Sequence, residues 1–226
     1  MAATLATRTT RILAIDRHLS MAEAYGLRLA EEDDLEFLGV LAKTSAAVSA
    51  VQRLRPDVCL IDTISGDAAE GIRTLADIRE AEASVRCLVL VDVEGSGAAL
   101  LAELLHYDPT GIFSKGDGLE EFVKAVRQVS EDSYELSPPM EIEVASARSL
   151  MAMFSTGERR VMSALARYGN KAEAASATFY SPETINTYVR RIRKRITERE
   201  GKSGFRLPDL VAWARHHGFH HIEPTL

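Results

Sequence analysis

The first half of the chain alternates short apolar runs with longer amphipathic stretches. The apolar runs predict β-strands, and the stretches between them carry apolar residues at helical spacing. Five strands alternating with five helices are typical of an α/β fold with a doubly wound, five-stranded parallel sheet. The expected strands are Arg11–Ile15, Glu36–Leu41, Val58–Asp62, Cys87–Val91 and Gly111–Ser114. The expected helices are at about 19–30, 44–54, 68–82, 97–107 and 118–130.

Polar side chains stand at the ends of several strands of this predicted sheet. Asp16 follows the first strand, Asp62 ends the third, and Lys115 follows the fifth, while Val91 ends the fourth. Because ligands bind at the carboxyl ends of strands in such sheets, we expect two carboxylates and an amine to meet at one place. The alternative interpretation of Asp62 is a partly buried carboxylate that only pairs with a neighbouring cation.

The regular alternation ends near residue 130. The segment Ser137-Pro138-Pro139 cannot continue a helix, so we expect an inter-domain linker there, with room for a short helix after the prolines. The first ten residues contain no apolar stretch long enough for a signal peptide and are expected to form a loose tail. The predicted segments are a tail at 1–10, a domain at 11–130, a linker at 131–153 and a second domain at 154–226.

The second half of the chain predicts helices only. Ser155 and Glu158 have the spacing of a capping box, which begins a helix that extends to about Tyr168. Ser181 followed by Pro182 is another helix start, because serine caps free amides and proline suits the first helical position. The other expected bounds are about 171–178, about 182–198 and about 208–217.

The helix that begins after Ser181 has two different faces. Its apolar residues recur at steps of four, three and four, a single stripe that faces a core. The stripe is Ile185, Val189, Ile192 and Ile196, and the opposite side holds Asn186, Thr187, Arg190, Arg191, Arg193 and Lys194. A short helix, a tight turn and a capped basic helix fit the major groove of double-stranded DNA. The alternative interpretation of the basic run is a solvated helix face.

The formal charge of −6 hides a difference between the two halves. Residues 1–150 hold 14 Lys and Arg against 26 Asp and Glu, a charge of −12, whereas residues 151–226 hold 13 against 7, a charge of +6. The difference indicates that only the second half meets a polyanion. Double-stranded DNA is the favoured partner, and an adaptor that packs the basic helix on an acidic protein is the alternative.

Other function classes find little support in the sequence. No apolar run reaches the roughly 18 residues of a membrane span, so no membrane partner is expected. Neither a nucleophile–base pair nor a glycine-rich phosphate loop supports an enzyme. Cys59 and Cys87 lie in apolar runs and are expected to be buried reduced thiols, which suits the cytoplasm. No metal or other cofactor is expected, because the histidine-rich run at 216–221 has the character of a solvated helix end.

The second half resembles the helix-turn-helix of the NarL/FixJ (LuxR-type) response regulators, without a gap from Phe154 to Ile196. The family's conserved positions correspond to Glu158, Glu173, Ala175, Ser181, Pro182, Thr184 and Ile185. The resemblance implies a sequence-specific transcriptional regulator that contacts DNA from the start of this helix, at Asn186, Thr187 and Arg190. Together with the basic face, the expected DNA-binding residues are Thr184, Asn186, Thr187, Arg190, Arg191 and Lys194.

The sequence departs from that family after Ile196, where the connection to the last helix is longer. The last helix, with Leu210 and Trp213, resembles the family's dimerisation helix. The resemblance implies a homodimer, or a heterodimer with a related regulator.

Residues of about 10–130 resemble the receiver domain of the same family, which accepts a phosphoryl group on an aspartate beside a magnesium ion. The phosphoacceptor position corresponds to Asp62 and the family's lysine to Lys115. Other positions depart from the family: the acidic pair is Asp16-Arg17, the switch hydroxyl is Val91, the switch aromatic is Ile112, and the usual Met-Pro is Ser65-Gly66.

These departures predict an atypical receiver that does not run ordinary phosphorelay chemistry, and they argue against a sensor kinase as a partner. We expect Arg17 beside Asp62 in the space that magnesium would fill, because the ends of the first and third strands are neighbours. The alternative is a conventional response regulator that is activated by phosphorylation of Asp62.

Overall fold

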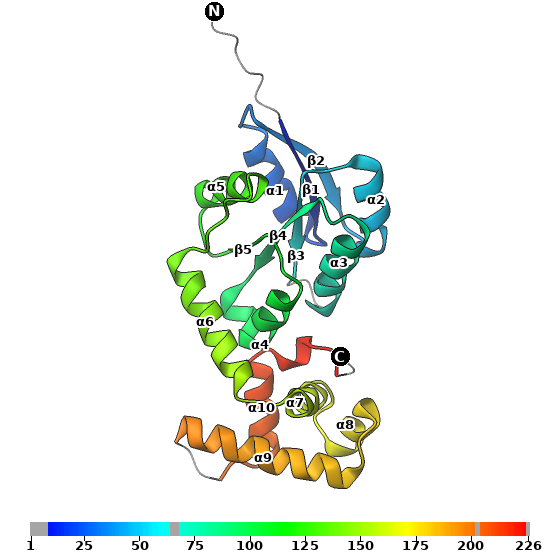
Figure 1. Cartoon of the computed structure of the whole chain (residues 1–226), viewed down its shortest axis with the longest axis vertical. Helices are drawn as coiled ribbons and strands as arrows, with labels where there is room; N and C mark the ends of the chain where they lie inside the picture. The colour runs from blue at the N-terminus through cyan, green and yellow to red at the C-terminus, as the bar shows by residue number, and fades with distance from the viewer. Residues whose placement is uncertain (1–8, 64–67, 202–203, 225–226) are drawn as a thin grey trace, which may run out of the picture. The chain divides into compact units, whose positions relative to one another are not determined.

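The computed structural model describes residues 9–63, 68–201 and 204–224. The chain divides into two compact units (Figure 1). The first unit comprises residues 1–93 and 107–140, and the second comprises residues 94–106 and 141–226. No helix in this described part of the chain is long and apolar enough to cross a membrane.

The first unit is built on a parallel five-stranded sheet with the strand order β2-β1-β3-β4-β5. The strands are β1 (Thr10–Ile15), β2 (Leu35–Leu41), β3 (Val58–Asp62), β4 (Arg86–Val91) and β5 (Gly111–Ser114). Every residue of β3 is buried, as the centre of a sheet covered on both faces requires. The predicted doubly wound α/β fold is confirmed, and each predicted strand begins and ends within one residue of the observed one.

Helices cover both faces of this sheet, α1 and α5 on one side and α2 and α3 on the other (Figure 1). Their bounds are α1 (Leu19–Leu29), α2 (Ala47–Leu54), α3 (Ala68–Ala81) and α5 (Leu119–Ser130), and a 3-10 turn η1 (Thr44–Ala46) precedes α2. The core between the sheet and the first pair centres on Phe122, which is fully buried. Its ring lies 4.4 Å from that of Tyr25 and 5.6 Å from that of Phe113, measured between centroids. Cys59 and Cys87 are buried free thiols in the sheet, as expected.

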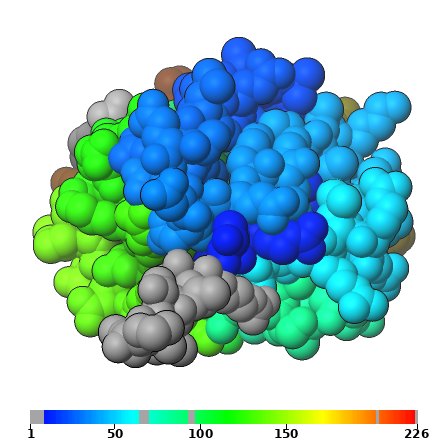
Figure 2. Space-filling model, turned by 90° about the horizontal axis from the view of Figure 1, so that it is seen from above, coloured from blue at the N-terminus to red at the C-terminus, as the bar shows by residue number. Residues whose placement is uncertain are grey.

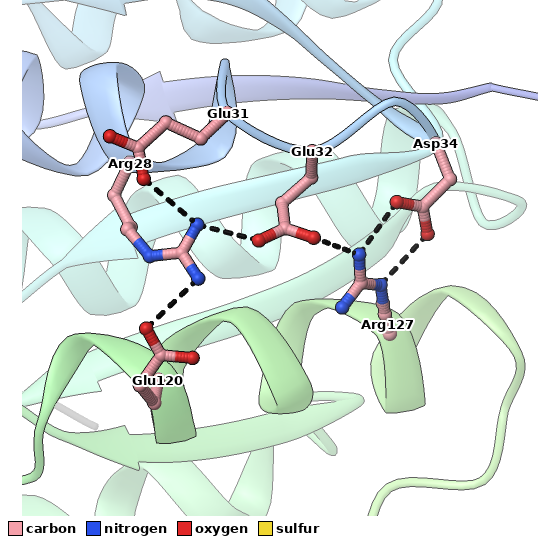
Figure 3. A network of polar contacts seen from close by, with 6 residues as sticks. All are labelled: Arg28, Glu31, Glu32, Asp34, Glu120 and Arg127. Carbon is pink, nitrogen blue, oxygen red and sulfur yellow. Dashed lines mark hydrogen bonds and ion pairs between the residues drawn. The ribbon is translucent and has the colours of Figure 1, made fainter.

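Charged side chains join α5 to the segment that connects α1 and β2 (Figure 3). The guanidinium of Arg127 donates to both carboxylate oxygens of Asp34, at 2.8 and 2.6 Å, and also to Glu32. Arg28 donates to Glu32 at 2.6 Å and to Glu120 at 3.0 Å. In Figure 2 the blue α1–β2 segment and the green α5 lie side by side on the surface of this unit. Because surface pairs contribute little singly, the network orients the two segments more than it stabilises them.

The second unit is helical and has a single described core cluster. Its helices are α4 (Val93–His106), α6 (Pro138–Ala152), α7 (Thr156–Tyr168), α8 (Lys171–Thr178), α9 (Pro182–Glu200) and α10 (Leu207–His216), with a 3-10 turn η2 (Phe219–His221). The capping box is present at the start of α7, where Glu158 N donates to Ser155 Oγ at 3.3 Å and Ser155 N donates to the Glu158 carboxylate at 2.8 Å.

Helix α6 is longer than the short helix expected in the linker, because it has 15 residues. Pro138 and Pro139 stand at its first turn, where the backbone N–H groups have no intrahelical acceptor, so the prolines begin the helix without breaking it. Leu150 and Met151 from its last turn are buried in the core of the second unit. Much of the predicted linker is therefore part of a folded unit.

Helix α4 packs in the second unit although it lies between β4 and β5 in the sequence. Ala99 is fully buried in that unit's core, and its backbone N–H donates to the His217 carbonyl at 2.9 Å. Gly97 interrupts the helix with φ 74°, and a Cβ there would lie 2.6 Å from backbone atoms of both His217 and Gly218. The close approach of two backbones requires glycine at this position.

The histidine-rich segment is not simply a solvated helix end. His217 is half-buried, and its ring centroid lies 4.1 Å from that of Trp213. Burial, with a smaller contribution from the neighbouring His216, lowers the pKa of His217 to about 4, although Glu200 opposes the shift. The native state therefore holds this imidazole neutral at pH values where an unfolded chain would protonate it.

We expect the second unit to lose stability as the pH falls from about 6.5 toward about 4, the interval between the ordinary and the native pKa of His217. The sign follows because the unfolded state binds more protons than the native state throughout this interval. Thermal unfolding of the wild type and of His217→Gln across this pH range measures the effect. The stability of the variant is expected to depend less steeply on pH, and equal slopes for the two proteins would contradict the assignment.

Candidate functional site

The basic helix predicted after Ser181 is α9. Ser181 Oγ accepts a hydrogen bond from Thr184 N at 3.1 Å, and Pro182 is the first helical residue. The predicted apolar stripe is the buried side of this helix, and the exposed fraction of each of its residues is 2% or less. The cap and the stripe together fix which side of the helix faces outward.

The outward side carries the residues that were expected to contact DNA. Asn186, Arg190, Arg191 and Lys194 are exposed, and Thr184 and Thr187 are half-buried. Lys194 is paired on the same helix with Glu198 at 3.8 Å. Three cations and an amide therefore face away from the core along the first half and the middle of α9, where a major groove would meet them.

Lys171, which sequence reasoning did not single out, also belongs to this surface. It is the first residue of α8, and its Nζ donates to Asn186 Oδ1 at 2.6 Å. The sequence indicated where Lys171 lies, because Asn170 directly before it is a typical helix cap. In the structure Asn170 Oδ1 accepts a hydrogen bond from Glu173 N at 2.9 Å. A cation in the first turn of the preceding helix lies beside the start of the recognition helix in this kind of turn.

The structure corrects the expectation for the dimerisation residues. Leu210 is fully buried in the core of its own unit, so its side chain is not available to a partner. The ring of Trp213 packs edge-on against Phe154 at 6.0 Å, and its Nε1 donates to Glu200 at 3.3 Å. Leu210, which the resemblance assigned to the interface, thus belongs to the side of α10 that faces the core. Ala212 and His216 are exposed on the same helix.

The carboxyl edge of the sheet brings together the residues that were expected there. Lys115 Nζ lies 2.6 Å from Asp62 Oδ1, and Lys115 N donates to the carbonyl of Val91 at 2.8 Å. The side chains of Asp16 and Asp62 are only 3% and 1% exposed. Both line a cavity of about 10 Å³, which has room for about one water-sized atom. The two carboxylates thus line one cavity, and the amine of Lys115 lies against one of them.

The environment of Asp16 opposes its negative charge. Burial is the largest cause that raises the pKa of its carboxyl, and the nearby carboxylate of Asp62 raises it further. The backbone N–H of His18, which donates to Asp16 Oδ1 at 2.7 Å, and the ammonium of Lys115 lower it. Asp16 Oδ2 is buried and has no hydrogen-bond partner among the described residues.

Arg17 lines the cavity together with Asp16 and Asp62, and its guanidinium pairs there with Glu70 at 3.5 Å. The imidazole of His18 also lies near the aspartates, because His18 Nδ1 lies 3.9 Å from Asp16 Oδ1 and 3.8 Å from Asp62 Oδ2. His18 was not predicted to belong to this site, although it lies only two residues after Asp16 and close to the end of β1.

The positions of the family's switch residues hold apolar side chains. Val91 and Ile112 are each 2% exposed. A buried hydroxyl close to the acceptor is present instead in Thr63, whose Oγ1 donates to the Leu90 carbonyl at 3.1 Å. Ser65 and Gly66 lie outside the described residues. The pocket thus keeps the acceptor and the lysine and has an apolar side chain at both switch positions.

The pocket does not fit the magnesium ion that the receiver resemblance implies. Mg²⁺ prefers an octahedral set of oxygen ligands, usually carboxylates with water. Asp16 and Asp62 supply two such groups, but the third position of the family is the cation Arg17, which lines the same cavity and pairs there with Glu70. A guanidinium therefore stands where the family has a carboxylate ligand.

The parallel α/β sheet with this pocket, together with the helical unit that carries a capped basic helix, has the architecture of a response regulator with a helix-turn-helix output. None of the established protein-family models matches the chain. Curated relatives nevertheless match most of its length. The response regulator GacA of Pseudomonas aeruginosa is 24% identical over 194 residues, covering 83% of this chain and 89% of that protein. The transcriptional regulatory protein UhpA of Escherichia coli K12 is 25% identical over 177 residues, covering 78% of this chain and 86% of that protein.

A solved structure supports the same fold. RcsB from Salmonella enterica serovar Typhimurium, bound to a promoter in the presence of a phosphomimetic, matches with a TM-score of 0.61 at 15% identity, covering 92% of this chain and 99% of that one. The resemblance to LuxR-type response regulators is confirmed, at the low identity of a divergent relative. GacA is named a response regulator and UhpA a transcriptional regulatory protein.

Proposed function

We propose that this chain is a transcriptional regulator that binds double-stranded DNA at specific sequences through α9. The observation that carries the proposal is the two-sided character of that helix: an apolar stripe fully used in the core, and an exposed face of Asn186, Arg190, Arg191 and Lys194. Residues 154–226 would act as the DNA-binding domain and residues 11–130 as the receiver. DNA binding by the structural neighbour RcsB adds support.

Duplex binding across salt concentrations distinguishes DNA recognition from an adaptor role on an acidic protein. Each phosphate contact lowers the logarithm of the binding constant by about 0.9 for a tenfold rise in salt. We expect a slope that reflects several contacts, together with at least about 1000-fold preference for fragments selected from the genome over random duplex. A shallow slope without sequence preference would favour the adaptor.

The receiver pocket supports regulation without ordinary phosphorelay chemistry. Val91 and Ile112 offer no hydroxyl or aromatic hydroxyl to report a phosphoryl group, and the donor set is poor for magnesium. The contact between Lys115 and Asp62 is the observation that favours the conventional alternative. It serves equally as an ion pair that holds a buried carboxylate in place.

Incubation with acetyl phosphate and Mg²⁺ is expected to leave Asp62 unlabelled, and Asp62→Asn is expected to regulate its targets nearly as the wild type does. The reason is that Arg17 stands where the family has a carboxylate ligand for the cation, and that both switch positions hold apolar side chains. Intact-protein mass spectrometry after incubation and binding to selected fragments check the two parts. A stable phosphoryl adduct on Asp62, or loss of regulation in the variant, would support the conventional mechanism instead.

The proposal includes a dimer that uses the exposed side of α10. Ala212→Arg places a charge on that side without touching the core, whereas Leu210→Arg would unfold the unit and could not test an interface. In sedimentation experiments we expect Ala212→Arg to shift the protein toward monomer and to weaken its binding to paired half-sites. An unchanged dimer would move the interface to the receiver or to a different regulator.

A further inference from the structure

Two polar side chains from successive helices meet on the proposed DNA-binding surface of the second unit. Lys171 is the first residue of α8, and Asn186 lies in the second turn of α9. Lys171 Nζ donates to Asn186 Oδ1 at 2.6 Å. Among the described residues this is the one hydrogen bond of either side chain, and no carboxylate there pairs with the ammonium. The positive charge of Lys171 therefore stands beside the amide without being neutralised.

The two helices are held in place beneath this pair (Figure 1). Ala174, which lies one turn after Lys171, is fully buried in the core cluster of the unit. Ile185 and Val189, which lie on either side of Asn186 in the sequence, are buried in the same cluster. The core therefore sets the separation of the two backbones, and the outer parts of the two polar side chains are what can still turn.

The hydrogen bond decides which groups the pair offers to a ligand. A primary amide has an oxygen that accepts through two lone pairs and a nitrogen that donates two N–H groups. Lys171 occupies one lone pair of Asn186 Oδ1, and the charge of its ammonium repels a second donor that approaches the same oxygen. Asn186 Nδ2 and the remaining N–H groups of Lys171 stay available. The pair thus offers donors and hardly any acceptor.

The major groove distinguishes a donor pair from a free asparagine. Guanine presents two neighbouring acceptors there, N7 and O6, whereas adenine presents the acceptor N7 and the donor N6–H₂. A free asparagine suits adenine, because its amide offers one donor and one acceptor side by side. Asn186 with its oxygen held by an ammonium suits guanine better, because both groups on that base edge accept hydrogen bonds.

We propose, on the basis of the DNA binding by α9 proposed above, that Lys171 sets the base specificity of Asn186 and makes it select guanine over adenine. Lys171 acts here as a positioning residue, since it works through the amide that it holds. Its removal should change the preferred base at one position of the DNA site. A lysine that contacts only a phosphate has a different signature, because its loss weakens binding to all duplexes alike.

Selection from a random pool of duplexes by the full-length wild type, Lys171→Met and Asn186→Ala tests this role. Methionine keeps a long unbranched side chain and removes both the charge and the N–H donors. We expect guanine in the wild-type motif at the position where Asn186→Ala loses its preference. Two duplexes that differ only at this base pair then give the ratio of the affinities for guanine and adenine, by fluorescence anisotropy. Lys171→Met should lower this ratio at least about fivefold, the lower end of the effect of one good base contact.

The matched control is Lys194→Met, which removes the same charge from an exposed position on α9. It should weaken binding to both duplexes by the same factor and leave the ratio unchanged. Circular dichroism verifies that both methionine variants are folded. A probe with 7-deazaguanine at the same position supplies a readout that needs no variant, because this base lacks the N7 acceptor. The wild type should bind this probe at least about fivefold more weakly than the guanine probe.

Three results would overturn the role of Lys171 and leave DNA recognition by α9 standing. They are adenine in place of guanine in the wild-type motif, an unchanged ratio in Lys171→Met, and equal binding of the guanine and 7-deazaguanine probes. Selection of no shared motif by the wild type would instead overturn both proposals together, so the two failures can be told apart.

Discussion

Replacing Asn186 and Arg190 with alanine is expected to abolish sequence-specific DNA binding while the second unit stays folded. Both side chains are exposed on α9, so their removal leaves the core unchanged. A good contact to a base edge contributes about 1–3 kcal/mol, which is about 5- to 150-fold in affinity for each residue. The double variant should therefore bind selected fragments no better than random duplex, as measured by fluorescence anisotropy at fixed salt.

The matched control for that experiment is Glu198→Ala, an exposed residue further along the same helix. Its removal takes away the partner of Lys194 but no proposed DNA contact, so specificity should be retained. Wild-type discrimination by the double variant would mean that α9 is aligned on DNA in a different register, or that it does not enter the groove.

The second large effect is expected from Ile192→Asp, which should unfold the second unit. Ile192 is fully buried in the core cluster, and an unpaired carboxylate there destabilises by at least about 3–5 kcal/mol. Together with the lost packing of an isoleucine, about 2–5 kcal/mol, this loss removes most or all of the stability of an ordinary domain, about 5–15 kcal/mol. Chemical denaturation followed by the fluorescence of Trp213, which lies in the same unit, measures the loss.

Arg191→Asp is the control at the neighbouring position. It introduces the same carboxylate on the exposed side of the helix, so the unit should unfold at nearly the wild-type denaturant concentration. DNA binding by this variant should weaken, because a phosphate would now face a negative charge. Comparable stability of Ile192→Asp and Arg191→Asp would contradict the assigned faces of α9.

The strands and the recognition helix could be predicted because each has one dominant periodic signal. β3 is buried on both faces and is apolar throughout until Asp62, and α9 has a stripe with a capped start. The length of helix α6 was underestimated because Pro138 and Pro139 were taken to end a helix. Prolines also suit the first turn of a helix, and here they begin one. The membership of α4 in the second unit depends on the contact of Gly97 with His217 and Gly218, which no local pattern encodes.

The candidate pocket was predicted only in part for a similar reason. The rule that strand ends meet at one edge placed Asp16, Asp62 and Lys115 together correctly. It says nothing about the direction in which successive side chains of the following loop turn, so it did not show that Arg17 pairs with Glu70 or that His18 lies near the aspartates. Leu210 shows a related limit, because the resemblance of the last helix to a dimerisation helix does not say which of its side chains face the core.

The most direct test of the central claim is genome-wide occupancy, in the cells that carry the gene, of the wild type beside the variant with Asn186→Ala and Arg190→Ala. The account predicts discrete wild-type sites that share one sequence motif and that the double variant loses at unchanged protein level. Occupancy without a shared motif, or the same sites in both proteins, would contradict sequence-specific recognition by α9.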